Sequence, residues 1–118
     1  MLGRRLLKWG FHEVKTMQEY TKLTSELKTP YVVDFYASWC GPCKMLWPVL
    51  SKLESENGGK WTIIKVDIDE EGVGELIEQH QVAGVPTLAF YKNNSLSHQH
   101  TGFVNDADFK KLETQHLL

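Results

Sequence analysis

Long apolar segments, cysteines and an excess of one charge are all missing or scarce in this sequence. No apolar run approaches the ~18 residues that cross a membrane, so we expect no membrane partner. Lys and Arg total 13 and Asp and Glu total 15, and this near balance argues against nucleic acid as a partner. Two cysteines in 118 residues are too few for a secreted disulfide scaffold. The remaining class is one compact domain with an ordinary hydrophobic core.

The first ten residues differ in composition from the rest. They carry three basic residues, and no acidic residue precedes Glu13. Such a basic, acid-poor segment, with apolar residues roughly on one helical face, is typical of an organelle transit peptide. We therefore predict a basic extension over residues 1–10, the remnant of a targeting signal, ahead of a domain over residues 11–118. This interpretation places the protein in the mitochondrial matrix. The alternative is a basic terminus without a targeting role, in a cytoplasmic protein.

The rest of the chain alternates between two apolar patterns. Continuous β-rich runs predict strands, and apolar residues three and four positions apart predict helices. Strands are expected over residues 11–15, 31–36, 61–68, 87–91 and 95–101, and helices over residues 16–28, 40–56, 73–80 and from 105 onward. The order βαβαβαββα predicts an α/β fold with helices on both faces of one sheet. That sheet should be parallel in its first half and mixed overall, because its last two strands form a hairpin.

The two cysteines lie three positions apart, directly after a buried strand and at the start of a helix, in the run Trp39 to Lys44. Pro42 suits the first helical position, where its missing N–H is no loss, and Gly41 permits a tight turn. Cys40 then falls at about the helix N-cap, where free N–H groups and the positive end of the dipole stabilise an anion. The thiolate is the nucleophilic form of cysteine, and one helical turn brings the two sulfurs within disulfide range.

This arrangement predicts thiol–disulfide exchange. Cys40 should attack a substrate disulfide, and Cys43, deeper in the helix, should attack Cys40 and release the reduced substrate. A zinc site is the competing interpretation, but four ligands are usually needed and no second cysteine pair exists. His98 and His100 are the weak candidates for completing it. We expect neither a metal nor a cofactor.

Several separated motifs resemble those of the thioredoxin family. Residues 33–44 are similar to its active-site segment with the Trp-Cys-Gly-Pro-Cys motif, and residues 84–87 to its cis-proline loop. Residues 65–69 are similar to its third strand, and Gly102 to the glycine after its last strand. The resemblance covers nearly the whole chain from residue 11 onward.

The resemblance implies a thioredoxin fold, a central mixed five-stranded sheet flanked by four helices. It implies a protein-disulfide reductase that maintains cell redox homeostasis, acts as a monomer and needs no cofactor of its own. The partners implied are an NADPH-dependent thioredoxin reductase and disulfide-containing client proteins of the peroxiredoxin type. A redox-inactive binding module on the same fold is the alternative from another functional class. Three residues depart from the family pattern: Tyr36, Trp47 and Thr101.

Two charged residues interrupt the most apolar strands. Asp34 should be buried, and because burial raises the pKa of a carboxyl group it is the candidate general base for Cys43. An aspartate on a solvent-exposed edge strand is the alternative. Lys65 could pair with Asp34 across adjacent strands and tune it, or could be a lysine that extends its ammonium to the surface.

The substrate-binding surface is expected around the cysteines. By resemblance, the Val85–Pro86 bond is cis, which would leave the Val85 backbone free to pair with a substrate strand. The residues expected at this surface are Trp39, Gly41, Pro42, Val85, Pro86 and Gly102.

Overall fold

The computed structural model describes residues 11–118, so the predicted extension over residues 1–10 lies outside the described residues. The strands are β1 (Phe11–Val14), β2 (Tyr31–Tyr36), β3 (Thr62–Asp67), β4 (Thr87–Lys92) and β5 (Ser95–Thr101). The helices are α2 (Met17–Glu26), α3 (Gly41–Glu56), the short 3-10 helix η1 (Glu71–Val73), α4 (Gly74–Gln79) and α5 (Asp106–His116). The predicted element order is confirmed.

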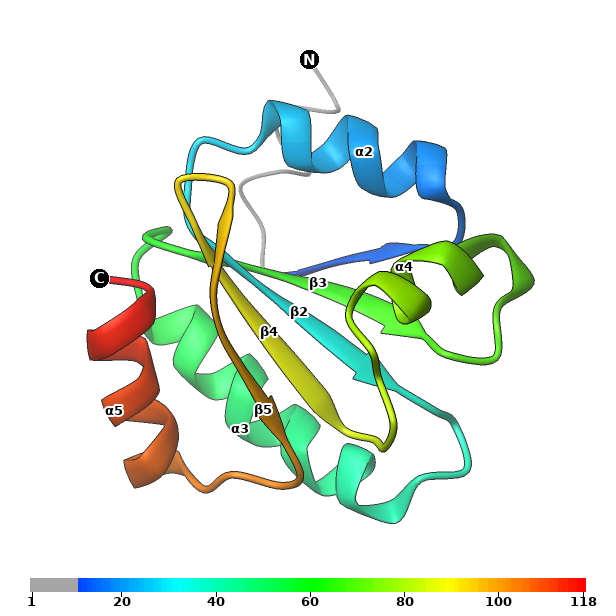
Figure 1. Ribbon diagram of the computed structural model, residues 1–118. Coiled ribbons are helices and arrows are strands. Elements are labelled where there is room, and N and C mark those ends of the chain that lie inside the picture. Colours follow the sequence, from blue (N-terminus) through cyan, green and yellow to red (C-terminus); the bar gives the residue numbers. More distant parts are fainter. Residues whose placement is uncertain (1–10) are drawn as a thin grey trace.

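The five strands form one mixed sheet in the order β1-β3-β2-β4-β5. β3 pairs in parallel with both β1 and β2, whereas β4 is antiparallel to β2 and β5. Helices α3 and α5 cover one face, and α2 and α4 cover the other (Figure 1). β2 therefore lies at the centre, which explains why its sequence is almost continuously apolar.

Local capping signals give the helix starts. Thr16 Oγ1 accepts a hydrogen bond from Glu19 N (3.1 Å), and Glu19 Oε1 accepts one from Lys15 N (2.6 Å). Asn105 Oδ1 accepts from the backbone N–H of Asp108 (2.8 Å) at the start of α5. Helix α2 ends at Glu26, two residues before its predicted end at residue 28, because the backbone of the next residue is already extended.

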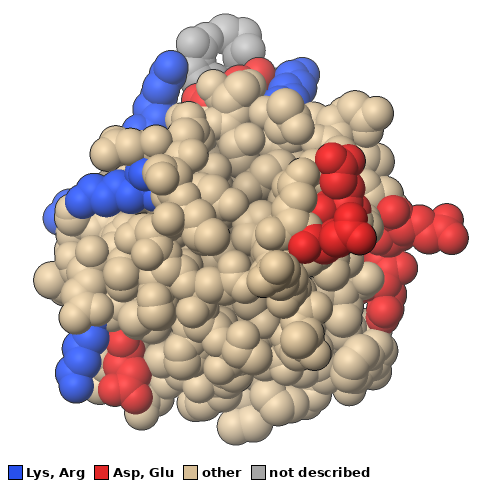
Figure 2. Space-filling view, in the orientation of Figure 1, with Lys and Arg blue, Asp and Glu red and all other residues tan. Residues whose placement is uncertain are grey.

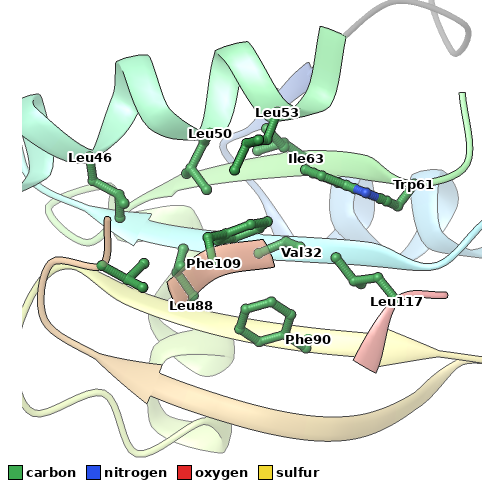
Figure 3. Packing of buried hydrophobic residues seen from close by; sticks show 11 residues of the cluster. Val32, Leu46, Leu50, Leu53, Trp61, Ile63, Leu88, Phe90, Phe109 and Leu117 are labelled. Carbon is green, nitrogen blue, oxygen red and sulfur yellow. The ribbon is translucent and has the colours of Figure 1, made fainter. Parts of the chain in front are cut away.

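The core on the α3 and α5 side is built around Phe109 of α5. Its ring lies 5.6 Å from that of Trp61 and 5.8 Å from that of Phe90. Figure 3 shows Leu46, Leu50 and Leu53 of α3 pointing toward the sheet. The apolar side chains that they meet there are Val32, Leu88 and Phe90. Met45 is apolar but 64% exposed, since Cys43 and Leu46 take the inward positions on that turn. Within residues 11–118, no helix is long and apolar enough to cross a membrane.

Candidate active site

The two cysteines lie where β2 leads into α3 at the carboxyl end of the central strand. Cys40 is the N-cap of α3, and its Sγ accepts a hydrogen bond from the backbone N–H of Cys43 (3.2 Å). The two residues form a disulfide, with Cα atoms 5.3 Å apart. Both are nearly buried, whereas Gly41 and Pro42 between them are exposed. The predicted N-cap position and sulfur pairing are therefore confirmed.

The loop before β4 lies directly beside Cys40. The Val85–Pro86 peptide bond is cis, as predicted, and the Val85 carbonyl oxygen is 3.7 Å from Cys40 Sγ. Gly102 N donates a hydrogen bond to the Pro86 carbonyl oxygen (2.8 Å), which ties the end of β5 to the same place. Pro86 itself is buried, so its ring adds little to the predicted substrate-binding surface. Val85 and Gly102 are half-buried and remain accessible there.

Trp39 is the largest exposed apolar side chain beside the disulfide. It is 67% exposed, and its Nε1 donates a hydrogen bond to Asp69 Oδ2 (2.9 Å). A hollow of about 260 Å³ lies between Trp39, Val85 and apolar residues of the α4 region. Phe103, which is not among the residues expected at the substrate-binding surface, directly follows Gly102 and is 42% exposed. The sequence feature that could have indicated this residue is an aromatic side chain in a loop, outside the apolar repeat of any strand or helix.

Acidic side chains gather at one edge of this face of the molecule. Figure 2 shows them over the η1 and α4 region, while basic side chains lie mainly toward the opposite side. The exposed acids of the two helices and the loop before them are Asp69, Glu71, Glu75 and Glu78. Because Asp69 bonds to Trp39, this acidic edge borders the hollow beside the disulfide.

Asp34 is buried in β2, with 3% of its surface exposed, and its Oδ1 has no hydrogen-bond partner. Burial raises the pKa of Asp34 to about 7, while the charge of Lys65 opposes that rise and the charge of Glu13 adds to it. The predicted burial is confirmed, and the exposed edge-strand alternative is wrong. A carboxyl group in this environment exchanges its proton near neutral pH.

Lys65 lies opposite Asp34 in the register of β2 and β3, as expected. Of the two alternatives, the ion pair with Asp34 does not form: between described residues the ion pair is Lys52–Asp106 (2.8 Å). The Lys65 ammonium instead lies over aromatic rings, 4.1 Å from the ring centre of Trp47 and 4.5 Å from that of Tyr36. Attraction between the cation and the rings takes the place of that ion pair.

A cleft of about 310 Å³, separate from the hollow that Val85 lines, reaches Cys43. Its lining includes Cys43, Lys65, Tyr36 and Trp47. The cleft therefore brings solvent to the second cysteine beside Lys65, the register neighbour of Asp34.

The histidines form no metal centre. Within residues 11–118 there is no group of three or more His, Cys, Asp or Glu side chains that could hold a metal ion. The ring of His98 stacks on that of His116 (4.6 Å), and burial together with the neighbouring His116 and His100 lowers the pKa of His98. His80 is buried in the core, with its ring nitrogens 2.8 Å from the Leu76 carbonyl oxygen and 2.6 Å from the Tyr91 hydroxyl.

Comparison with known proteins matches residues 12–114 to the thioredoxin family model. Thioredoxin of Bacillus subtilis is 37% identical over 86% of this chain and 94% of its own length. Mitochondrial thioredoxin of Mus musculus is 42% identical over 69% of this chain and 47% of its own length.

Solved structures agree with these relatives. One chain comes from a study of thiol resolution in a yeast mitochondrial 1-Cys peroxiredoxin via the glutathione and thioredoxin systems. It matches this chain with a TM-score of 0.75 at 28% identity, covering 88% of this chain and 94% of that one. The family match includes residues of all five strands, and the cysteine pair forms its disulfide at the expected place. This chain therefore belongs to the thioredoxin family and is a thiol–disulfide oxidoreductase that reduces protein disulfides.

Proposed function

We propose that Cys40 is the attacking thiol and Cys43 the resolving thiol of this reductase. The observation that carries this order is the position of Cys40 as the N-cap of α3, with its sulfur next to the Val85 carbonyl oxygen. The Cys40 thiolate forms a bond to one client sulfur, the client disulfide breaks, and the other client sulfur leaves as a thiolate. Cys43 then loses its proton and attacks Cys40 Sγ, which forms the Cys40–Cys43 disulfide and releases the second client thiolate. The client gains two electrons and, from the dithiol and solvent, two protons.

Asp34 is the proposed acceptor of the Cys43 proton. Its carboxyl group is buried, lacks a hydrogen-bond partner at Oδ1 and has a pKa raised to about 7. A base with a pKa near the working pH suits proton transfer from a thiol. Lys65, the register neighbour of Asp34, is the proposed tuning residue.

The client is proposed to bind as an extended strand along the Val85 backbone. The loop of Val85 and Pro86 places a backbone carbonyl beside Cys40. The proposed surface also includes Trp39, Gly41 and Pro42, which adjoin Cys40 in the sequence, and Gly102, which is hydrogen-bonded to Pro86. An unpaired backbone segment beside a nucleophile favours strand addition by the substrate. The acidic edge over α4 favours clients that carry basic residues near their disulfide.

The proposed reductant is an NADPH-dependent thioredoxin reductase, which would return the Cys40–Cys43 disulfide to the dithiol. Peroxiredoxin-type proteins are the proposed client class to test first, supported by the similarity to a chain from a peroxiredoxin study. The experiment is NADPH consumption with a thioredoxin reductase and insulin as disulfide substrate. Catalytic turnover supports the proposal, whereas binding of clients without turnover would favour the redox-inactive binding module.

Phe103→Ala should raise KM for a client with an apolar residue beside its disulfide by about tenfold, with kcat unchanged. The reason is that losing part of a buried aromatic contact costs about 1–2 kcal/mol. The measurement is steady-state reduction of a peptide disulfide by reductase-coupled assay. Leu96→Ala is the matched control, since Leu96 is similarly exposed (47%) but lies near the far end of β5. An equal change in both variants would remove Phe103 from the client surface.

We also propose that residues 1–10 direct the protein to mitochondria, as their basic composition and the mitochondrial relatives suggest. Fusing residues 1–10 to a fluorescent reporter should move the reporter to mitochondria, while the same segment with its three basic residues changed to Gln should leave it diffuse. Deleting residues 1–10 should leave thermal stability and reductase turnover unchanged. A diffuse reporter with the unaltered segment would contradict the targeting role.

A further inference from the structure

Three aromatic rings from three different elements surround the ammonium of Lys65. Its Nζ lies 4.1 Å from the ring centre of Trp47 on α3, 4.5 Å from that of Tyr36 on β2 and 5.9 Å from that of Phe11 on β1. The rings of Phe11 and Trp47 also contact each other edge to face, 4.6 Å apart. A cation within about 6 Å of such ring centres is attracted to each of them. We call these three residues the aromatic cage.

Lys65 holds its ammonium against the aromatic cage although a carboxylate lies on each neighbouring strand. In the sheet register, Glu13 of β1 pairs with Lys65, and Lys65 pairs with Asp34 of β2, so the three charged residues form a row across adjacent strands. Neither carboxylate forms an ion pair with the lysine. Glu13 Oε2 accepts a hydrogen bond from the Tyr36 hydroxyl, and Asp34 Oδ1 has no partner. Rings rather than carboxylates therefore hold the Lys65 ammonium.

We propose that Trp47 is a positioning residue that holds the Lys65 ammonium in the cleft, out of ion-pair reach of Asp34, so that Asp34 stays free to accept the Cys43 proton. Trp47 has the shortest ring distance to the ammonium, and it comes from α3, the helix that carries Cys43. The side chains of Trp47 and Lys65 both line the cleft that reaches Cys43. The inference rests on the proposed role of Asp34 and adds a residue that controls it.

The charges around Asp34 determine the direction of the effect. Burial raises its pKa, Lys65 opposes the rise and Glu13 of β1 adds to it. Its partner on β4 is the uncharged Leu88, and the groups on the α3 side of the cleft are the Cys43 sulfur and Lys44. Lys65 is thus the cation beside Asp34 in the sheet register, and its attraction for the carboxylate grows as the distance shortens. Freeing the ammonium from Trp47 should let it approach Asp34 and favour the ionised carboxylate.

Trp47→Leu should lower the pKa of Asp34 by about 1 or more. The measurement is a carbon-13 NMR titration of the Asp34 carboxyl carbon in the oxidised full-length protein, with single-turnover client reduction measured over the same pH range. Trp47→Phe, which keeps a ring for the cation, should retain most of the original pKa. It also keeps the test available if Trp47→Leu fails to fold.

Lys65→Met provides the decisive background, because Trp47→Leu could also lower the pKa by admitting water to Asp34. In Lys65→Met protein, adding Trp47→Leu should leave the pKa of Asp34 unchanged. A shift of the same size in that background, or no shift in the presence of Lys65, would overturn the proposal. A shift of the Asp34 pKa that leaves the pH profile of reduction unmoved would keep Trp47 as the positioning residue and reject Asp34 as the proton acceptor.

Discussion

Cys40→Ser protein should lose more than about a thousandfold of its disulfide reductase activity, and Cys43→Ser protein should accumulate mixed disulfides with its clients through Cys40. The first change removes the nucleophile at the N-cap of α3, the sulfur that faces Val85. The second leaves the attack intact but removes the thiol that resolves the intermediate. That thiol is tethered one helical turn away, and such proximity is worth many orders of magnitude over a thiol in solution.

The measurement combines reductase-coupled turnover with mass spectrometry of complexes trapped from a defined peptide disulfide. The double Cys40→Ser, Cys43→Ser variant is the control, and it should trap nothing and reduce nothing. Each single serine variant replaces a nearly buried sulfur with a similar volume, so thermal melting should confirm that both fold. Trapping by the Cys40→Ser protein and not by the Cys43→Ser protein would reverse the two roles.

Much of the fold and the cysteine site could be predicted because the signals are local. The N-cap position of Cys40 follows from a helix that starts at Gly41 with proline in its first turn, and the burial of Asp34 follows from the apolar strand around it. The turn at Asn93 and Asn94 follows from residues that tolerate positive φ, here 55° and 61°.

The remaining features depend on contacts between distant segments. Strand register could place Lys65 beside Asp34, but the direction of a long flexible side chain depends on what else it meets. Trp47 and Phe11 come from elements 18 and 54 residues away in sequence, and neither shows a signal for a cation. In the same way, Pro86 is buried because the end of β5 lies beside it, which no local pattern could indicate.

Asp34→Asn should stabilise the folded protein at pH 8 by up to about 4 kcal/mol and leave its stability nearly unchanged at pH 4. Burial raises the pKa of folded Asp34 to about 7, against about 4 in an unfolded chain. A carboxyl whose pKa is raised by folding binds its proton more tightly when folded, so ionising it above pH ~4 lowers stability, and the penalty is complete above the folded pKa. Removing the carboxyl group leaves no charged partner unpaired, because Lys65 is held by the aromatic cage and forms no ion pair with Asp34.

The same Asp34→Asn change should slow the resolving step about tenfold to a hundredfold below pH 7, because an amide cannot accept the Cys43 proton. The difference should shrink toward pH 9, where solvent hydroxide deprotonates the thiol without help. The measurements are thermal melting of the oxidised protein at pH 4 and pH 8 and single-turnover client reduction from pH 6 to pH 9. A gain in stability with a loss of rate is the expected conflict at a functional site. A variant that is less stable at pH 8 and equally fast across the range would instead make Asp34 a structural residue of β2.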